Sequence, residues 1–188
     1  MNLISEPSSP WYAVSTRARY EALAAMQIEA RGYEVFLPLY KERRRWSDRV
    51  KVLELPLFAG YLFCRLDVNN RLPVLSAPGV VQIVGTGKTP IAVDAEEIDA
   101  IRAAVKSNRT SEPCAFAKVG ARVRVDAGPL CGVEGIILTV KGQRRLILSV
   151  SLLQRSVSVE IENDAVSPLP SALSGSTADG TYCAQNQR

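Results

Sequence analysis

The sequence predicts an α+β domain followed by a small all-β barrel, and a change of pattern near residue 106 leads to this expectation. Before it, short apolar strands alternate with two segments of helical periodicity. From Lys118 onward there are only short alternating strands separated by turn signals, which is typical of a small barrel. We therefore expect domains at residues 10–106 and 118–169, a polar linker at 107–117 and a disordered tail at 170–188.

The first domain opens with a strand at residues 11–15, and Thr16 is a candidate cap for a helix that continues to about Arg31. Helical spacing predicts a buried stripe of Tyr20, Leu23, Ala24 and Ile28. A second helix follows the capping residue Asp94, with Ile98, Ile101 and Val105 on its buried face. Strands interrupted by two such helices favour a mainly antiparallel sheet with the helices packed on one face.

Residues 56–66 form the most apolar stretch of this domain and predict its central strand. Pro56 should begin the strand, because proline cannot donate a hydrogen bond inside a sheet. Alternation places Tyr61 and Phe63 on one face and Leu62 and Cys64 on the other. One face lines the core; the aromatic face either lies under the protein's own helices or meets a partner.

A basic segment precedes this strand. Residues 41–51 contain six basic and two acidic residues, a local excess of +4 that equals the net charge of the whole chain. A turn at Ser47 and Asp48 predicts an exposed hairpin of strands 41–46 and 50–55. The alternative to nucleic-acid binding is a charged edge that prevents aggregation. We expect nucleic-acid contact by Arg43, Arg44, Arg45, Trp46, Arg49 and Lys51.

The residue inventory argues against an enzyme. The chain has no histidine, which removes the commonest general base, and its four cysteines are far apart, which disfavours a zinc site or a disulfide framework. The segment 85–88 lacks the upstream glycine of a phosphate-binding loop. We expect no catalytic residue, no metal and no cofactor. Neither a membrane span nor a signal peptide is recognisable, so we expect a cytoplasmic protein.

Two groups of motifs at a defined spacing point to a family. The first domain carries Trp11-Tyr12, Leu57-Phe58-Ala59-Gly60-Tyr61-Leu62-Phe63 and Pro78-Gly79-Val80. The second carries Val123-Arg124-Val125, then Gly128-Pro129 and Gly135, which is similar to a KOW motif. Together they resemble the NusG family of transcription elongation factors, in which an NGN domain is joined to an SH3-like KOW barrel.

The resemblance implies RNA polymerase as the main partner. In the family, aromatic residues of the central strand bind the clamp helices of the largest polymerase subunit, and a later loop faces the other side of the cleft. The matching positions are Phe58, Tyr61 and Phe63 with Ser15 at the rim, and Asn70, Arg71 and Leu72 in the loop. Upstream non-template DNA passes the first helix in the family, at positions matching Arg17, Arg19 and Gln27.

For the barrel, the resemblance implies a docking loop at Leu152, Leu153 and Arg155 for a small-subunit ribosomal protein or for termination factor Rho. Leu153 departs from the phenylalanine usual in housekeeping members, and the basic hairpin is more similar to specialised RfaH- or UpxY-like antiterminators. Two alternatives stay open: a housekeeping factor, and a free-standing KOW protein that binds RNA or the ribosome. We expect a monomer with no membrane partner.

Overall fold

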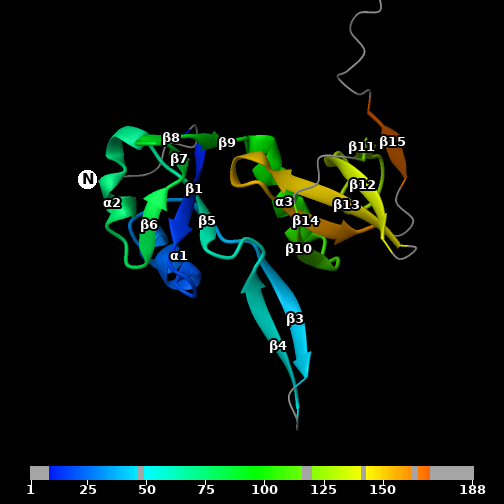
Figure 1. Ribbon diagram of the computed structural model, residues 1–188, viewed down its shortest axis with the longest axis horizontal. Coiled ribbons are helices and arrows are strands. Elements are labelled where there is room, and N and C mark those ends of the chain that lie inside the picture. The colour runs from blue at the N-terminus through cyan, green and yellow to red at the C-terminus, as the bar shows by residue number, and fades with distance from the viewer. Residues whose placement is uncertain (1–8, 46–48, 116–119, 141–142, 162–164, 170–188) are drawn as a thin grey trace, which may run out of the picture.

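The computed structural model describes residues 9–45, 49–115, 120–140, 143–161 and 165–169. It shows two sheet-based domains beside one another, with helix α3 (Ala95–Lys106) between them and a long hairpin projecting from the first domain (Figure 1). No helix within these ranges combines the length and apolar character that a membrane crossing requires.

The sheet of the first domain is antiparallel. Its strands run in the order β2-β5-β1-β6, and β9 also pairs with β1. Ala13 lies opposite Phe63 and Val14 opposite Leu62, so the predicted division of residues between the two faces is confirmed. The strands are β1 (Trp11–Thr16), β2 (Val35–Phe36), β5 (Tyr61–Arg65), β6 (Val80–Ile83) and β9 (Ala92–Val93). The short pair β7 (Gly85–Thr86) and β8 (Thr89–Pro90) lies beyond β6.

Helices cover both faces of this sheet. Ala24 and Ile28 of α1 (Glu21–Glu29) and Val74 of α2 (Leu72–Leu75) share one hydrophobic cluster with Val14 and Leu62. On the opposite face, the buried residues of α3 (Ile98, Ile101 and Ala104) join a cluster with Trp11, Ala13 and Phe63. The α+β class is confirmed, with the difference that α3 lies on the other face from α1, because both faces of the sheet are apolar.

Helix α1 begins later than the sequence indicated. Thr16 is the last residue of β1, and its backbone N–H donates to the carbonyl of Gly60 at 2.9 Å, so it does not cap the helix. The turn that follows includes Arg19 with φ +68°, and Glu21 is the first helical residue. The buried residues of α1 are Glu21, Ala24, Ala25 and Ile28, so the predicted burial was correct for Ala24 and Ile28. It was wrong for Tyr20 and Leu23, which are both exposed.

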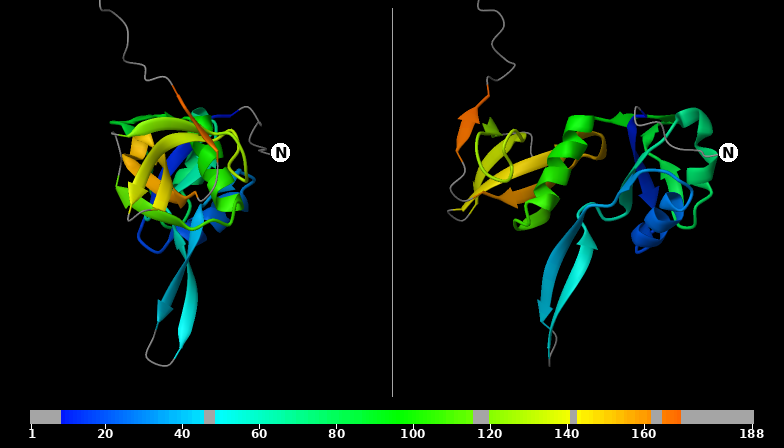
Figure 2. Two further views of the ribbon diagram at one scale, coloured as in Figure 1. Left: turned by 90° about the vertical axis from the view of Figure 1, so that its right-hand side faces the viewer. Right: turned by 180° about the vertical axis from the view of Figure 1, so that it is seen from behind.

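The predicted hairpin is confirmed as β3 (Leu39–Arg45) and β4 (Val50–Pro56), which project away from both domains (Figures 1 and 2). Pro56 ends β4 opposite Leu39, so the prediction that it begins the central strand was wrong. Residues 57–60 form a turn between the hairpin and β5, and Gly60 adopts φ +82° there. This turn joins the hairpin to the sheet.

The second domain is an antiparallel six-stranded sheet in the order β10-β14-β13-β12-β11-β15, as expected for an all-β barrel. The expected linker was wrong for residues 111–115, which form strand β10 and pair with β14. Pairing satisfies their backbone groups, which a polar composition alone could not reveal. The strands are β10 (Ser111–Ala115), β11 (Ala121–Val125), β12 (Glu134–Val140), β13 (Gln143–Val150), β14 (Arg155–Glu160) and β15 (Val166–Pro168). The predicted tail, residues 170–188, lies outside the described residues.

Candidate functional surfaces

The aromatic face of β5, the expected polymerase-binding surface, is covered in this structure. Phe58 and Phe63 are 1% and 0% exposed, and their rings meet edge to face with centroids 5.5 Å apart. Phe36 stacks on Phe63 at 6.2 Å. Tyr61 and Phe36 are half-exposed. The expectation of an exposed aromatic patch was therefore wrong for the two phenylalanines, since burial of such rings is strongly favourable wherever an apolar neighbour is at hand.

The cover comes from α3 and from the barrel. A single hydrophobic cluster contains Phe58 and Phe63 of the first domain, Ile98 and Ile101 of α3, and the inward-facing residues of the second domain, among them Leu146, Leu148 and Val150. Helix α3 lies directly against β13. The two domains thus share one core in the described conformation.

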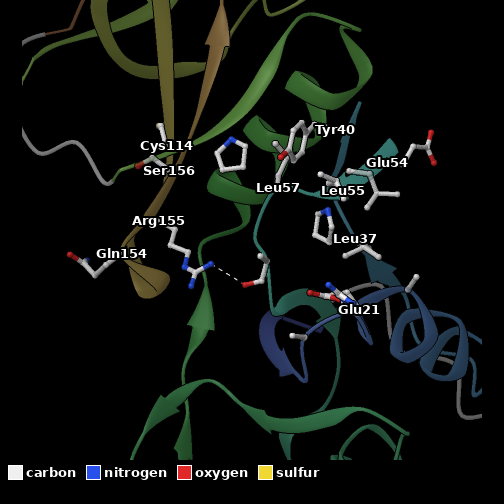
Figure 3. A pocket seen from close by; sticks show the side chains of 17 residues that line it. Glu21, Leu37, Tyr40, Glu54, Leu55, Leu57, Cys114, Gln154, Arg155 and Ser156 are labelled. Atoms are coloured by element: carbon white, nitrogen blue, oxygen red, sulfur yellow. Dashed lines mark hydrogen bonds between the residues drawn. The ribbon is translucent and has the colours of Figure 1, made fainter. Parts of the chain in front are cut away.

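Polar contacts close the same interface. The guanidinium of Arg155 lies 5.0 Å from the centroid of the Tyr61 ring. Its Nη1 donates a hydrogen bond to the carbonyl of Ala59 at 2.9 Å, which is the dashed line in Figure 3. The backbone N–H of Ser151 donates to the Glu97 carboxylate at 3.1 Å.

The barrel's expected docking loop is the element that makes these contacts. Leu152 and Leu153, in the 3₁₀ turn η2 (Ser151–Leu153), pack against the shared cluster. Two surfaces that sequence reasoning assigned to separate partners therefore contact each other.

The turn at residues 57–60 is held rigidly beside this contact. The Glu21 carboxylate, itself buried, accepts the backbone N–H of Gly60 at 2.8 Å. A cavity of about 990 Å³ lies next to the turn, between Leu55 and Tyr40 on one side and Cys114 and Ser156 of the barrel on the other (Figure 3). The interface is thus close-packed at the aromatic face and open next to it.

The other expected polymerase contact lies apart from the first. Asn70 ends the 3₁₀ turn η1 (Val68–Asn70), and its carbonyl accepts a hydrogen bond from the Tyr33 hydroxyl at 3.1 Å. Leu72, at the start of α2, is 76% exposed, whereas Arg71 is half-buried. In Figure 1 this region is at the end of the first domain remote from the barrel. The structure therefore leaves this second surface uncovered.

Of the expected nucleic-acid contacts within the described residues, all are exposed except Gln27 on α1, which is half-buried. Arg17 and Arg19 lie in the turn before α1. On the hairpin, Arg44 forms a two-pronged ion pair with Glu42 at 3.1 and 3.2 Å, which raises the pKa of the arginine. Trp46 lies outside the described residues. Sequence reasoning missed the two exposed valines of β4, Val50 and Val52, whose signal was an apolar pair inside a charged segment.

A cluster around Arg102 was also missed. Its guanidinium lies 5.0 Å from the Trp11 ring centroid and 5.2 Å from that of Phe36, and it pairs with Glu34 at 3.2 Å. These contacts fix α3 on the aromatic face. Burial raises the pKa of the nearby Cys64 thiol to about 12, so this cysteine stays protonated at neutral pH. The described residues contain no group of three or more side chains suited to bind a metal ion.

Comparison with known proteins gives consistent matches. Residues 9–102 match the family model described as transcription termination factor nusG. Transcription termination/antitermination protein NusG of Campylobacter jejuni is 28% identical, with 80% of this chain and 92% of that protein covered. NusG of Vibrio vulnificus is also 28% identical, with coverages of 87% and 97%. A solved structure titled "Domain interaction in Thermotoga maritima NusG" aligns with a TM-score of 0.50 at 22% identity, over 81% of this chain and 93% of that one.

Proposed function

The chain belongs to the NusG family of transcription termination/antitermination proteins, and from this premise we propose that it binds RNA polymerase through the β5 face and suppresses pausing or termination. The observation that carries the proposal is the aromatic surface around Phe58, Tyr61 and Phe63, which α3 and the barrel cover together. Ser15 lies at the rim of this surface on β1, directly opposite Tyr61.

Binding at this face requires the barrel to move. Because Arg155 lies over Tyr61 and the phenylalanines are fully buried, polymerase and the barrel compete for the same residues. The described conformation is on this proposal the resting one. In the open one, the face binds the clamp helices, and the docking loop with Leu152, Leu153 and Arg155 is released for a ribosomal protein or Rho.

Asn70, Arg71 and the exposed Leu72 are proposed to contact the opposite side of the polymerase cleft. These residues lie at the end of the domain that is remote from the barrel, whereas the β5 face lies against the barrel. Two separate surfaces of this kind support a bridging role, in which the domain contacts both sides of the cleft. Arg17, Arg19 and Gln27, together with the basic hairpin, are proposed to contact upstream DNA, where their charge neutralises phosphates.

A binding measurement with purified RNA polymerase tests the main contact. Tyr61→Arg should weaken binding by about 30-fold, because loss of a desolvated aromatic anchor costs about 2 kcal/mol. Val81→Arg is the matched control: it introduces the same charge on an exposed position of β6, in the same sheet, and should change affinity less than about threefold. Equal affinity of Tyr61→Arg and the unaltered protein contradicts the proposal.

Transcription through a pause site and a Rho-dependent terminator tests the outcome of binding. We expect shorter pauses in the presence of the protein. Readthrough without stimulation of Rho identifies a specialised antiterminator, whereas stimulation of Rho identifies a housekeeping factor. A protein that leaves both signals unchanged and binds RNA without polymerase, with a steep salt dependence, would instead be the free-standing RNA-binding candidate.

A further inference from the structure

We propose that one face of the β3–β4 hairpin inserts into the major groove of duplex DNA. The arginine–valine face, as we name it, consists of Arg43, Arg45, Val50 and Val52. The inference rests on the proposed contact of the hairpin with upstream DNA and deepens it, since it specifies the form of nucleic acid and the side chains that meet it.

The strand register defines the two faces. Arg43 is paired with Val52 and Arg45 with Val50, and residues directly opposite each other in an antiparallel pair lie on the same side. Arg44 and Lys51 form the pair between them and therefore point to the other side.

Burial separates the faces as well. All four residues of the arginine–valine face are exposed. On the other face Arg44 and Lys51 are exposed, but Glu42 and Leu53 are half-buried. The arginine–valine face is therefore the one that is exposed at both of its residue pairs.

The two faces also differ in whether their arginines are paired with a carboxylate. Arg44 is engaged by Glu42 in a two-pronged ion pair, which locally cancels its charge. Within the described part of the chain, neither Arg43 nor Arg45 has a carboxylate partner. The arginine–valine face therefore offers two arginines without a carboxylate partner among the described residues to phosphates or base edges, whereas the arginine of the other face is paired.

The valines give this face a second property. Val50 and Val52 are 61% and 55% exposed, each directly opposite an arginine. A surface that only repels other sheet edges needs no such apolar pair. In the major groove, by contrast, apolar side chains contact the thymine methyl group, while arginine bonds to guanine or to phosphate.

Ribbon geometry selects duplex DNA over other nucleic acids. The major groove of B-DNA is about 12 Å wide and admits a two-stranded β-ribbon, whereas the deep, narrow major groove of duplex RNA does not admit side chains. A single strand is usually held by aromatic rings that stack on its bases. The arginine–valine face carries none, and Tyr40, the only ring in the described part of the hairpin, lies on the other face beside the barrel.

Fluorescence anisotropy with the full-length protein tests the proposal, using a 20-base-pair DNA duplex, one of its strands alone, and the corresponding RNA duplex. We expect the DNA duplex to bind most tightly. Arg43→Ala combined with Arg45→Ala should weaken duplex binding about tenfold or more and reduce the slope of log affinity against log salt by about 2. Circular dichroism verifies that the exposed substitutions leave the fold intact.

Arg44→Ala combined with Lys51→Ala removes the same formal charge from the other face and is the matched control. It should weaken binding at least threefold less and change the slope by less than about 1, because Arg44 is already paired. Equal losses for the two double variants would overturn the proposal, since the hairpin would then act only as a source of positive charge.

Replacement of thymine by uracil in the duplex tests groove insertion directly, since uracil differs only by the missing methyl group. The unaltered protein should bind the uracil duplex about threefold more weakly than the thymine duplex. The variant with Val50→Ala and Val52→Ala should bind the two duplexes with equal affinity. Identical binding of both duplexes by the unaltered protein would overturn the proposal, as would tighter binding of the single strand or the RNA duplex.

These results are separable from those on polymerase. All DNA measurements use the protein without polymerase, so failure of Tyr61→Arg to affect polymerase binding leaves the groove proposal standing. Conversely, both arginine double variants should retain polymerase binding at the β5 face, and a failure of duplex binding leaves that function untouched.

Discussion

We propose a macromolecular partner for both the aromatic face of β5 and the arginine–valine face of the hairpin, yet the two faces differ in their exposure to solvent. The first is buried under α3 and the barrel, with Phe63 at 0% exposed; the second is open to solvent. Water solvates arginines well, so a basic surface can remain exposed to solvent, whereas an exposed contiguous aromatic surface favours aggregation. The comparison teaches that the chain covers its apolar surface with its own helix and barrel and leaves the basic surface open.

The largest expected effect is on the free energy of unfolding, which a substitution on the aromatic face should lower far more than one on the hairpin. Phe63→Ala should lower the free energy of unfolding by about 3–5 kcal/mol, because it opens a cavity in the shared core. Val52→Ala on the hairpin should change it by less than about 0.5 kcal/mol, since the side chain is already largely solvated. Chemical denaturation of both variants provides the measurement. Similar losses in the two would show that the contrast between the faces is not energetic.

A smaller effect is expected where the barrel holds the aromatic face closed. Arg155→Ala removes the contact with the Tyr61 ring and the hydrogen bond to Ala59, which should destabilise the closed arrangement by about 1 kcal/mol. Hydrogen exchange of the amides at residues 57–66 should become faster, and polymerase affinity should rise about fivefold.

The control for this variant is Arg122→Ala, an exposed arginine of β11 whose ion pair with Glu134 lies within the barrel. It should leave both readouts unchanged. If Arg155→Ala lowers polymerase affinity, the arginine belongs to the binding surface and does not act as a cover.

The smallest effect concerns the polar contact at the edge of the same interface. Glu97→Ala deletes the acceptor for the Ser151 amide and should destabilise the closed arrangement by about 0.5 kcal/mol. Glu96→Ala removes the same charge from the same first turn of α3 and should have no effect on exchange at residues 57–66. Indistinguishable exchange in the two variants would exclude Glu97 from the closure.

The structural features that depend on the local sequence pattern were predicted correctly. Alternation in residues 61–66 correctly assigned Phe63 and Cys64 to opposite faces, and Asp94 caps α3 by accepting the Glu96 amide as expected. The hairpin followed from its turn and its charges. In each case the information lies within a few residues of chain, where propensity and periodicity act.

What could not be predicted depends on contacts between distant segments. Nothing near Phe63 indicates that α3 and the barrel cover it, and nothing near Ser111 indicates that it pairs with Val159. The late start of α1 has a similar origin, because the Gly60 carbonyl draws Thr16 into the sheet. Tertiary contacts override local propensity at these positions.

Strand β10 limits how far the barrel can travel. Helix α3 ends at Lys106 and β10 begins at Ser111, so only residues 107–110 connect the domains while β10 stays paired. At about 3.5 Å per residue, such a connection spans less than about 20 Å. A barrel on so short a tether competes for the aromatic face at an effective concentration in the millimolar range. On the proposed mechanism, a weak partner free in solution would not displace the barrel, and the face would be accessible to a partner that binds several surfaces at once.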